Sequence, residues 1–139
     1  MLLAVLRCYS QNWNPDEFIQ KMGFDTDAVW HKGEIGRRGK PHDDSGCNLT
    51  ITDAQSLKEL EDDIRTFVQE YSDELTRLRS TGVTLDLDIG VTVGDSKQFS
   101  VSVYISPDDM ALFSKVGIGV TVSAYPTSDE ANEDEPNNV

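Results

Sequence analysis

The sequence predicts an α+β fold in which helices cover one face of a mainly antiparallel sheet of about 5–6 strands. One observation behind this is a long apolar stripe at helical spacing over residues 56–80. Another is a set of segments in which apolar and polar residues alternate, as they do in half-buried strands. The expected order is β-α-β-β-α-β-β-α-β, with one long and two short helices.

The length of 139 residues suits one domain, and 37% hydrophobic with 27% charged residues is an ordinary globular composition. We expect a single domain over residues 1–125. Residues 126–139 have no aliphatic pattern and are rich in Asp and Glu, which predicts an acidic, disordered C-terminal tail.

The first strand and the first helix are marked by their end residues. The apolar run at residues 2–6 predicts a strand that starts almost at residue 1. Asn14 and Pro15 are typical of a helix N-terminus, and Gly23 is typical of its end.

A glycine-rich stretch separates this helix from the next clear strand. A short extended piece is expected at 28–30. Residues 31–46 hold four glycines and a proline, which predicts an exposed loop or a hairpin with a mobile tip. Alternation at 47–52 then predicts a strand.

The strongest single signal is the helix over 56–80. Ser56 and Glu59 form a capping box at its start, and Gly82 follows its end. Its apolar residues recur at steps of three and four and form one stripe: Leu57, Leu60, Ile64, Phe67, Val68, Tyr71, Leu75 and Leu78.

Strict alternation returns in the C-terminal part. It predicts strands at 84–93 and 99–105, joined by a turn at Gly94–Asp95. A short helix is expected from Ser106 to Gly117, followed by a strand at 118–125.

The two short helices have similar ends. Asn14–Glu17 leads to Lys21–Phe24, and Ser106–Asp109 leads to Lys115–Ile118. One interpretation is that both helices use common capping chemistry. The other is that two related, ferredoxin-like strand–helix–strand halves pack about a pseudo-two-fold axis.

The net charge of −13 and the pI of about 4.3 bear on partners. Such acidity disfavours nucleic acid and anionic membranes, and it favours encounter with a basic protein. The alternative is that the acidity only keeps the chain soluble. No signal peptide and no apolar stretch of about 20 residues is visible, so we expect a cytoplasmic protein. Cys8 and Cys47 lie in predicted strands, which predicts buried free thiols.

No pattern for catalysis, a cofactor or a metal is found. There is no nucleophile elbow or phosphate-binding loop, and both histidines lie in or beside the flexible loop. His42, Asp43 and Asp44 lack the spacing that presents ligands to one ion. We therefore expect no enzyme, no cofactor, no metal and no catalytic residues.

Two groups of residues remain as binding candidates. Lys32, Arg37, Arg38 and Lys40 fall within nine positions of a chain with twelve positive charges, close to Trp30. Arginine forks among glycines suit an anion, and the alternative is a loop whose charges pair with the acidic body.

Asp86 and Asp88 point the same way from one strand, about 6.5–7 Å apart. Paired carboxylates can act in acid–base catalysis or bind a cation. The alternative is that both aspartates simply lie on the solvent-exposed face of a strand.

The segment 12–51 resembles a bacterial domain-of-unknown-function family, numbered 4279. The family carries a D/N-P-x-E helix, an L-G-[IF] turn, W-x-K-G, a loop with glycines and basic residues, and S-G-W-x-L. Cys47 stands where the family usually has tryptophan. The resemblance extends in pattern over residues 1–125, implies the α+β fold and a bacterial source, and supplies no catalytic residues. The matching residues are Asn14, Pro15, Glu17, Gly23, Phe24, Trp30, Lys32, Gly33, Ser45, Gly46 and Leu49.

Our favoured hypothesis is a non-enzymatic protein-binding module, such as an immunity-type or antitoxin-like inhibitor of a basic protein. The alternative is a sensor of a small anionic ligand that uses the basic, glycine-rich loop 31–42. A hydrolase that uses Asp86 and Asp88 is a remote third hypothesis.

Overall fold

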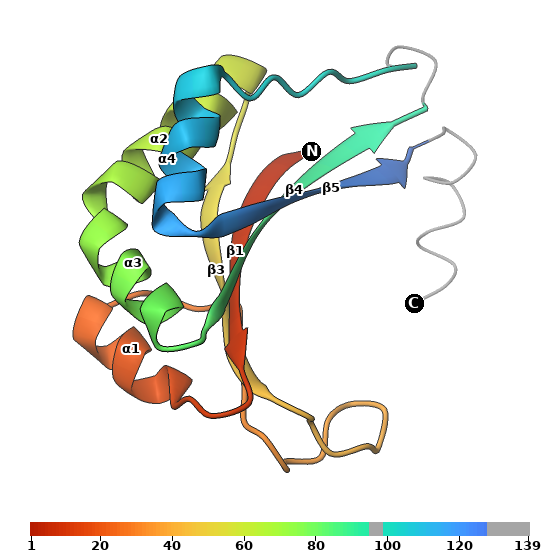
Figure 1. Cartoon of the computed structure of the whole chain (residues 1–139). Coiled ribbons are helices and arrows are strands. Elements are labelled where there is room, and N and C mark those ends of the chain that lie inside the picture. Colours follow the sequence, from red (N-terminus) through yellow and green to blue (C-terminus); the bar gives the residue numbers. More distant parts are fainter. Residues whose placement is uncertain (95–98, 128–139) are drawn as a thin grey trace.

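The computed structural model describes residues 1–94 and 99–127 and confirms the α+β class (Figure 1). The elements are β1 (Leu2–Ser10), α1 (Pro15–Met22), β2 (Ala28–Trp30), β3 (Ser45–Asp53), α2 (Leu57–Glu70), α3 (Ser72–Ser80), β4 (Thr84–Val93), α4 (Pro107–Val116) and β5 (Ile118–Pro126). The expected tail falls almost wholly on residues 128–139, which lie outside the described residues.

The strands form one five-stranded sheet in the order β2-β3-β1-β4-β5. Every neighbouring pair is antiparallel except β4 and β5, which are parallel and joined through α4. The mainly antiparallel sheet that the alternation predicts is therefore confirmed.

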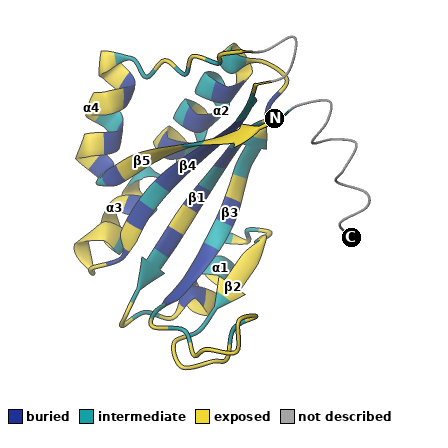
Figure 2. Ribbon diagram, turned by 90° about the vertical axis from the view of Figure 1, so that its right-hand side faces the viewer, coloured by how far each residue is buried: buried dark blue, intermediate teal, exposed yellow. Residues whose placement is uncertain are grey.

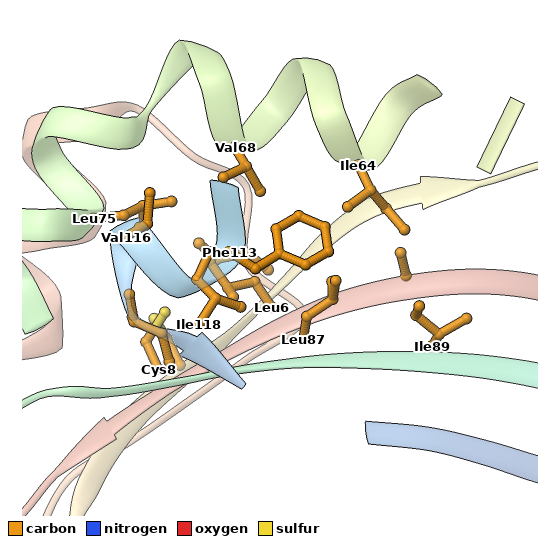
Figure 3. Packing of buried hydrophobic residues seen from close by; sticks show 14 of the residues in the cluster. Leu6, Cys8, Ile64, Val68, Leu75, Leu87, Ile89, Phe113, Val116 and Ile118 are labelled. Carbon is orange, nitrogen blue, oxygen red and sulfur yellow. The ribbon is translucent and has the colours of Figure 1, made fainter. Parts of the chain in front are cut away.

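Among residues 1–94 and 99–127, the four helices α1 to α4 lie on one face of the sheet, and none lies on the other (Figures 1 and 2). Alternation along β1 turns Ala4, Leu6 and Cys8 toward the helices, and these three side chains are at most 1% exposed. Figure 3 shows Leu6 and Leu87 of the sheet below Val68 and Phe113 of the helices. The side chains that alternate with these core residues therefore lie on the opposite side of the sheet.

The capping residues act as the sequence predicts. The Asn14 side chain accepts a hydrogen bond from Asp16 N at 3.1 Å, and the Ser106 hydroxyl accepts one from Asp109 N at 3.0 Å. Gly23 and Gly117 end these helices with φ of 68° and 93°, a conformation that favours glycine.

The strands that flank each of the two helices run in the same direction. β4 and β5 are neighbours, whereas β3 lies between β1 and β2. In both halves the two strands are parallel, but they are adjacent in one half and separated by a third strand in the other. Their relation as ferredoxin-like repeats stays a prediction.

The single long helix expected over 56–80 is wrong, because the chain breaks at Tyr71 into α2 and α3. Tyr71 has φ of −105° and ψ of 16°, and its ring packs at 4.9 Å from both Phe24 and Phe67. Leu75, in α3 beyond the break, is fully buried. The apolar stripe is correct, but periodicity alone does not show that the helix is interrupted at Tyr71.

The strand expected at 99–105 is also wrong. Residues 99–106 form no strand, although Val101, Val103 and Ile105 pack against the core and Ser102 and Tyr104 are exposed. The alternation therefore identifies the buried side of this segment. It does not identify a ladder partner, because β1 and β5 already occupy both edges of β4. Asp95 of the expected turn lies outside the described residues.

Cys8 and Cys47 are confirmed as buried free thiols. They lie opposite each other in the β1–β3 pair, and both are 0% exposed. A hydrogen bond with Cys47, together with burial, raises the pKa of the Cys8 thiol. Both thiols therefore belong to the core.

Candidate functional site

The side of the sheet away from the helices, which we call the open face, is the candidate site. The sheet curves so that this face lines the inside of the bend (Figure 1), and Figure 2 views the molecule from this side. Strand register sets its composition, because the residues that alternate with the core residues point here. From β1 and β4 these are Leu3, Val5, Arg7, Tyr9, Asp86, Asp88, Gly90 and Thr92, and from β5 they are Gly119, Thr121, Ser123 and Tyr125.

A network of charged and hydroxyl side chains holds the two predicted aspartates in place. Arg7 Nη2 donates to Asp88 Oδ2 at 2.7 Å, and the Ser123 hydroxyl donates to Asp88 Oδ1 at 2.8 Å. The Thr121 hydroxyl donates to Asp86 Oδ1 at 3.0 Å. Asp88 is 8% exposed, whereas the side chain of Arg7 is 45% exposed.

Sequence reasoning missed Arg7, Thr121 and Ser123 as members of this network. A signal for Arg7 is present, because it is the one charged residue in an otherwise uncharged strand. Thr121 and Ser123 form the polar half of the β5 alternation. Their place beside Asp86 and Asp88 depends on the parallel β4–β5 pairing, which the sequence analysis did not predict.

A hollow of about 430 Å³ opens beside this network. Arg7 and Asp88 contribute charged groups, and Gly90 leaves room because a side chain there would contact Tyr125. An apolar floor next to a fixed ion pair suits a side chain with an aliphatic stem and a charged end. The lining residues are Met1, Leu3, Val5, Arg7, Asp88, Gly90, Thr92, Tyr125, Pro126 and Thr127.

Residues 31–44 form a closed hairpin, which we call the basic hairpin. A bridge pairs Ile35 with Pro41, and backbone bonds of 2.9 Å join Gly33 N to His42 O and His42 N to Glu34 O. Of the two forms the sequence allowed, the structure has the hairpin. The hairpin connects the end of β2 to the start of β3, and Figure 1 shows it at the bottom of the view.

The four basic residues of this hairpin point into solvent. Lys32, Arg37, Arg38 and Lys40 are exposed, and none of them forms an ion pair with any acidic residue of segments 1–94 and 99–127. The idea that their charges pair with the acidic body is therefore not supported within those segments.

Trp30 lies at the base of the hairpin, and its ring packs against Gly46. A Cβ atom on Gly46 would lie 2.4 Å from the Trp30 ring. Its indole N–H donates to Asp44 at 2.8 Å, which fixes the ring between β3 and the hairpin. Two strands, β3 and β1, separate this ring from Asp86 and Asp88 on β4. The predicted site residues thus form two groups, one in the hairpin with Trp30 and one in the network.

His31 joins the hairpin to α1, and we expect this contact to depend on pH. Its ring nitrogens lie 2.7 Å from Asp16 and 2.9 Å from Glu34, and the hydrogen bond with Asp16 raises the pKa of His31. Because the folded pKa exceeds the unfolded value of about 6.5, the contact stabilises fully below that value and is lost as pH rises through the folded pKa.

An NMR titration of the His31 ring should therefore give a midpoint above that of the exposed imidazole of a short peptide. Asp16→Asn should lower it, whereas Glu17→Gln on the same turn should leave it unchanged. A midpoint equal to the peptide value in the parent chain would contradict the contact.

Within the described segments, no group of three or more His, Cys, Asp or Glu side chains is placed to hold a metal ion. Nor does any helix among those residues combine the length and apolarity that crossing a membrane requires.

Comparison with protein families matches residues 2–127 to DUF4279, a domain of unknown function. No curated protein and no solved structure matches the chain significantly.

Proposed function

We propose that this chain, which belongs to the DUF4279 family, is a non-enzymatic protein-binding module that holds a basic protein on its open face. The observation that carries the proposal is the fixed pair of carboxylates. Asp86 and Asp88 are held by Thr121, Ser123 and Arg7 on the open face, which none of the described helices covers.

Preset carboxylates favour binding because their side chains lose little freedom when a partner arrives. Asp86 can offer its second carboxylate oxygen to a lysine or an arginine, and the hollow beside Arg7 can take an aliphatic stem. The net charge of −13 speeds the approach of a basic partner. An inhibitor of a basic toxin, as an immunity protein is, would use the same features.

The basic hairpin supports a second candidate, a sensor of small anions. Arg37, Arg38 and Lys40 are exposed and free of ion pairs with the described acidic residues, so they could clasp a phosphate or carboxylate. A hydrolase ranks third because both oxygens of Asp88 already accept hydrogen bonds, one from Arg7 and one from Ser123. Asp88 is also only 8% exposed, so little of its carboxylate can reach a substrate.

The test first isolates a partner by affinity purification from cells that produce the chain naturally, and then measures the purified complex by calorimetry. Asp86→Asn should weaken binding about tenfold, which corresponds to the ~1.4 kcal/mol of one charge-assisted contact. Glu70→Gln, an exposed change on α2, should leave the affinity unchanged. Binding should also weaken as salt rises.

If Asp86→Asn and Glu70→Gln reduce the affinity for the partner equally, the site is not on the open face. A complex that survives Asp86→Asn but is lost on Arg37→Ala with Arg38→Ala would favour the hairpin. If no protein is retained, thermal-shift assays with inorganic phosphate and nucleotides test the second candidate directly.

A further inference from the structure

β5 is an unusually open edge of the sheet. It is nine residues long and has β4 on one side, and no strand of residues 1–94 or 99–127 pairs with its other side. The opposite edge, β2, is only three residues long and is preceded by Asp25 and Asp27. Proteins usually shield long edges with short strands, charges or cover, because free N–H and C=O groups pair readily with another strand.

The side of β5 that faces the helices is apolar and partly exposed. Val120 and Val122 pair with the core residues Leu87 and Ile89 of β4, yet they are 37% and 51% exposed. Only Ile118, next to α4, is buried in this strand. The apolar layer therefore continues beyond the area that the helices cover.

The same strand carries no charge. No Asp, Glu, Lys or Arg occurs from Val116 to Thr127, although 27% of the chain is charged and the net charge is −13. Two copies of so acidic a chain repel each other over most of their surfaces. At this edge two copies can contact each other without bringing carboxylates together. Because the edge has no acidic group, it has no charged group that would attract a basic partner.

We propose that β5 pairs antiparallel with β5 of a second copy of this chain, about a two-fold axis at Thr121. In this register Val120 lies opposite the partner's Val122 on the helix side of the sheet. The two-fold axis gives two such valine contacts per dimer. The two sheets then form one continuous sheet. The open faces, with Asp86 and Asp88, stay on the side of the sheet away from this valine contact.

Sedimentation equilibrium of the full chain over a concentration series tests the proposal. We expect twice the chain mass of 15.5 kDa. Val120→Lys should weaken the dimer about a hundredfold, because each of two symmetric contacts loses about a factor of ten. Val29→Lys is the matched control, since Val29 lies at the other edge and is also 37% exposed. It should leave the dimer intact.

Cross-linking tests the register. Thr121→Cys should give a disulfide-linked dimer when oxidised with diamide. Thr66→Cys, on the exposed side of α2, is the control and should not. The native Cys8 and Cys47 are buried in both variants. A monomer at every concentration overturns the proposal, as does a dimer that Val120→Lys leaves intact. A monomer that binds a strand of another protein through β5 also overturns it. Asp86→Asn should not affect the dimer, so failure here is distinct from failure of the proposed function.

Discussion

Gly46→Ala is expected to destabilise the fold by about 2 kcal/mol or more, as overpacking of a tight site typically does. The added Cβ atom would lie 2.4 Å from the Trp30 ring and 2.6 Å from the carbonyl oxygen of Cys8. Trp30 could swing away, but the Cys8 carbonyl belongs to the β1–β3 pair and cannot move without disturbing it. The midpoint of urea unfolding should fall, with the slope of the transition unchanged.

Gly90→Ala is the matched control on the same open face. Its Cβ would meet the end of Met1 at 3.3 Å and the Tyr125 ring at 3.5 Å, and both side chains can shift. We expect a change of about 0.5 kcal/mol or less, since a lower entropy of the unfolded chain offsets the crowding. If Gly46→Ala and Gly90→Ala unfold at the same urea concentration, Gly46 does not lie as close to the Cys8 carbonyl as described.

Local signals in the sequence predict the helix ends well. Asn14, Ser56 and Ser106 each accept a backbone hydrogen bond at the start of a helix. These motifs succeed because a cap needs only residues within one turn. The break at Tyr71 could not be predicted in this way, because no glycine or proline marks it, no side chain caps the start of α3, and the ring that Tyr71 contacts there, Phe24, is distant in sequence.

The candidate site could be predicted only in part for the same reason. Alternation correctly places Asp86 and Asp88 on one side of a strand. Their partners Arg7, Thr121 and Ser123 come from strands whose order the pattern does not specify. The extended segment 99–106 shows the same limit, since period-two alternation marks a buried side without showing whether a neighbouring strand is available.

The second large effect is expected at the ion pair that ties α2 to α4. Arg65 donates to both oxygens of Asp109, at 2.7 and 2.9 Å, and Asp109 is 5% exposed. Asp109→Asn should cost about 1.5–3 kcal/mol, the range for hydrogen bonds to charged groups. Asp62→Asn is the control, because this second partner of Arg65 has an exposed side chain, so its loss should leave the urea midpoint nearly unchanged.

The same pair should make stability depend on pH in a defined direction. The hydrogen bonds from Arg65 lower the pKa of Asp109. Because the folded pKa lies below the unfolded value of about 3.9, the contribution is fully present above that pH and is lost as pH falls through the folded pKa. Urea unfolding of the parent chain and of Asp109→Asn should therefore differ most at neutral pH and converge in acid. A difference that stays constant down to about pH 2 would mean that the charge of Asp109 does not contribute, since both forms of the group are sampled over that range. In that case shape alone would hold α4 against α2.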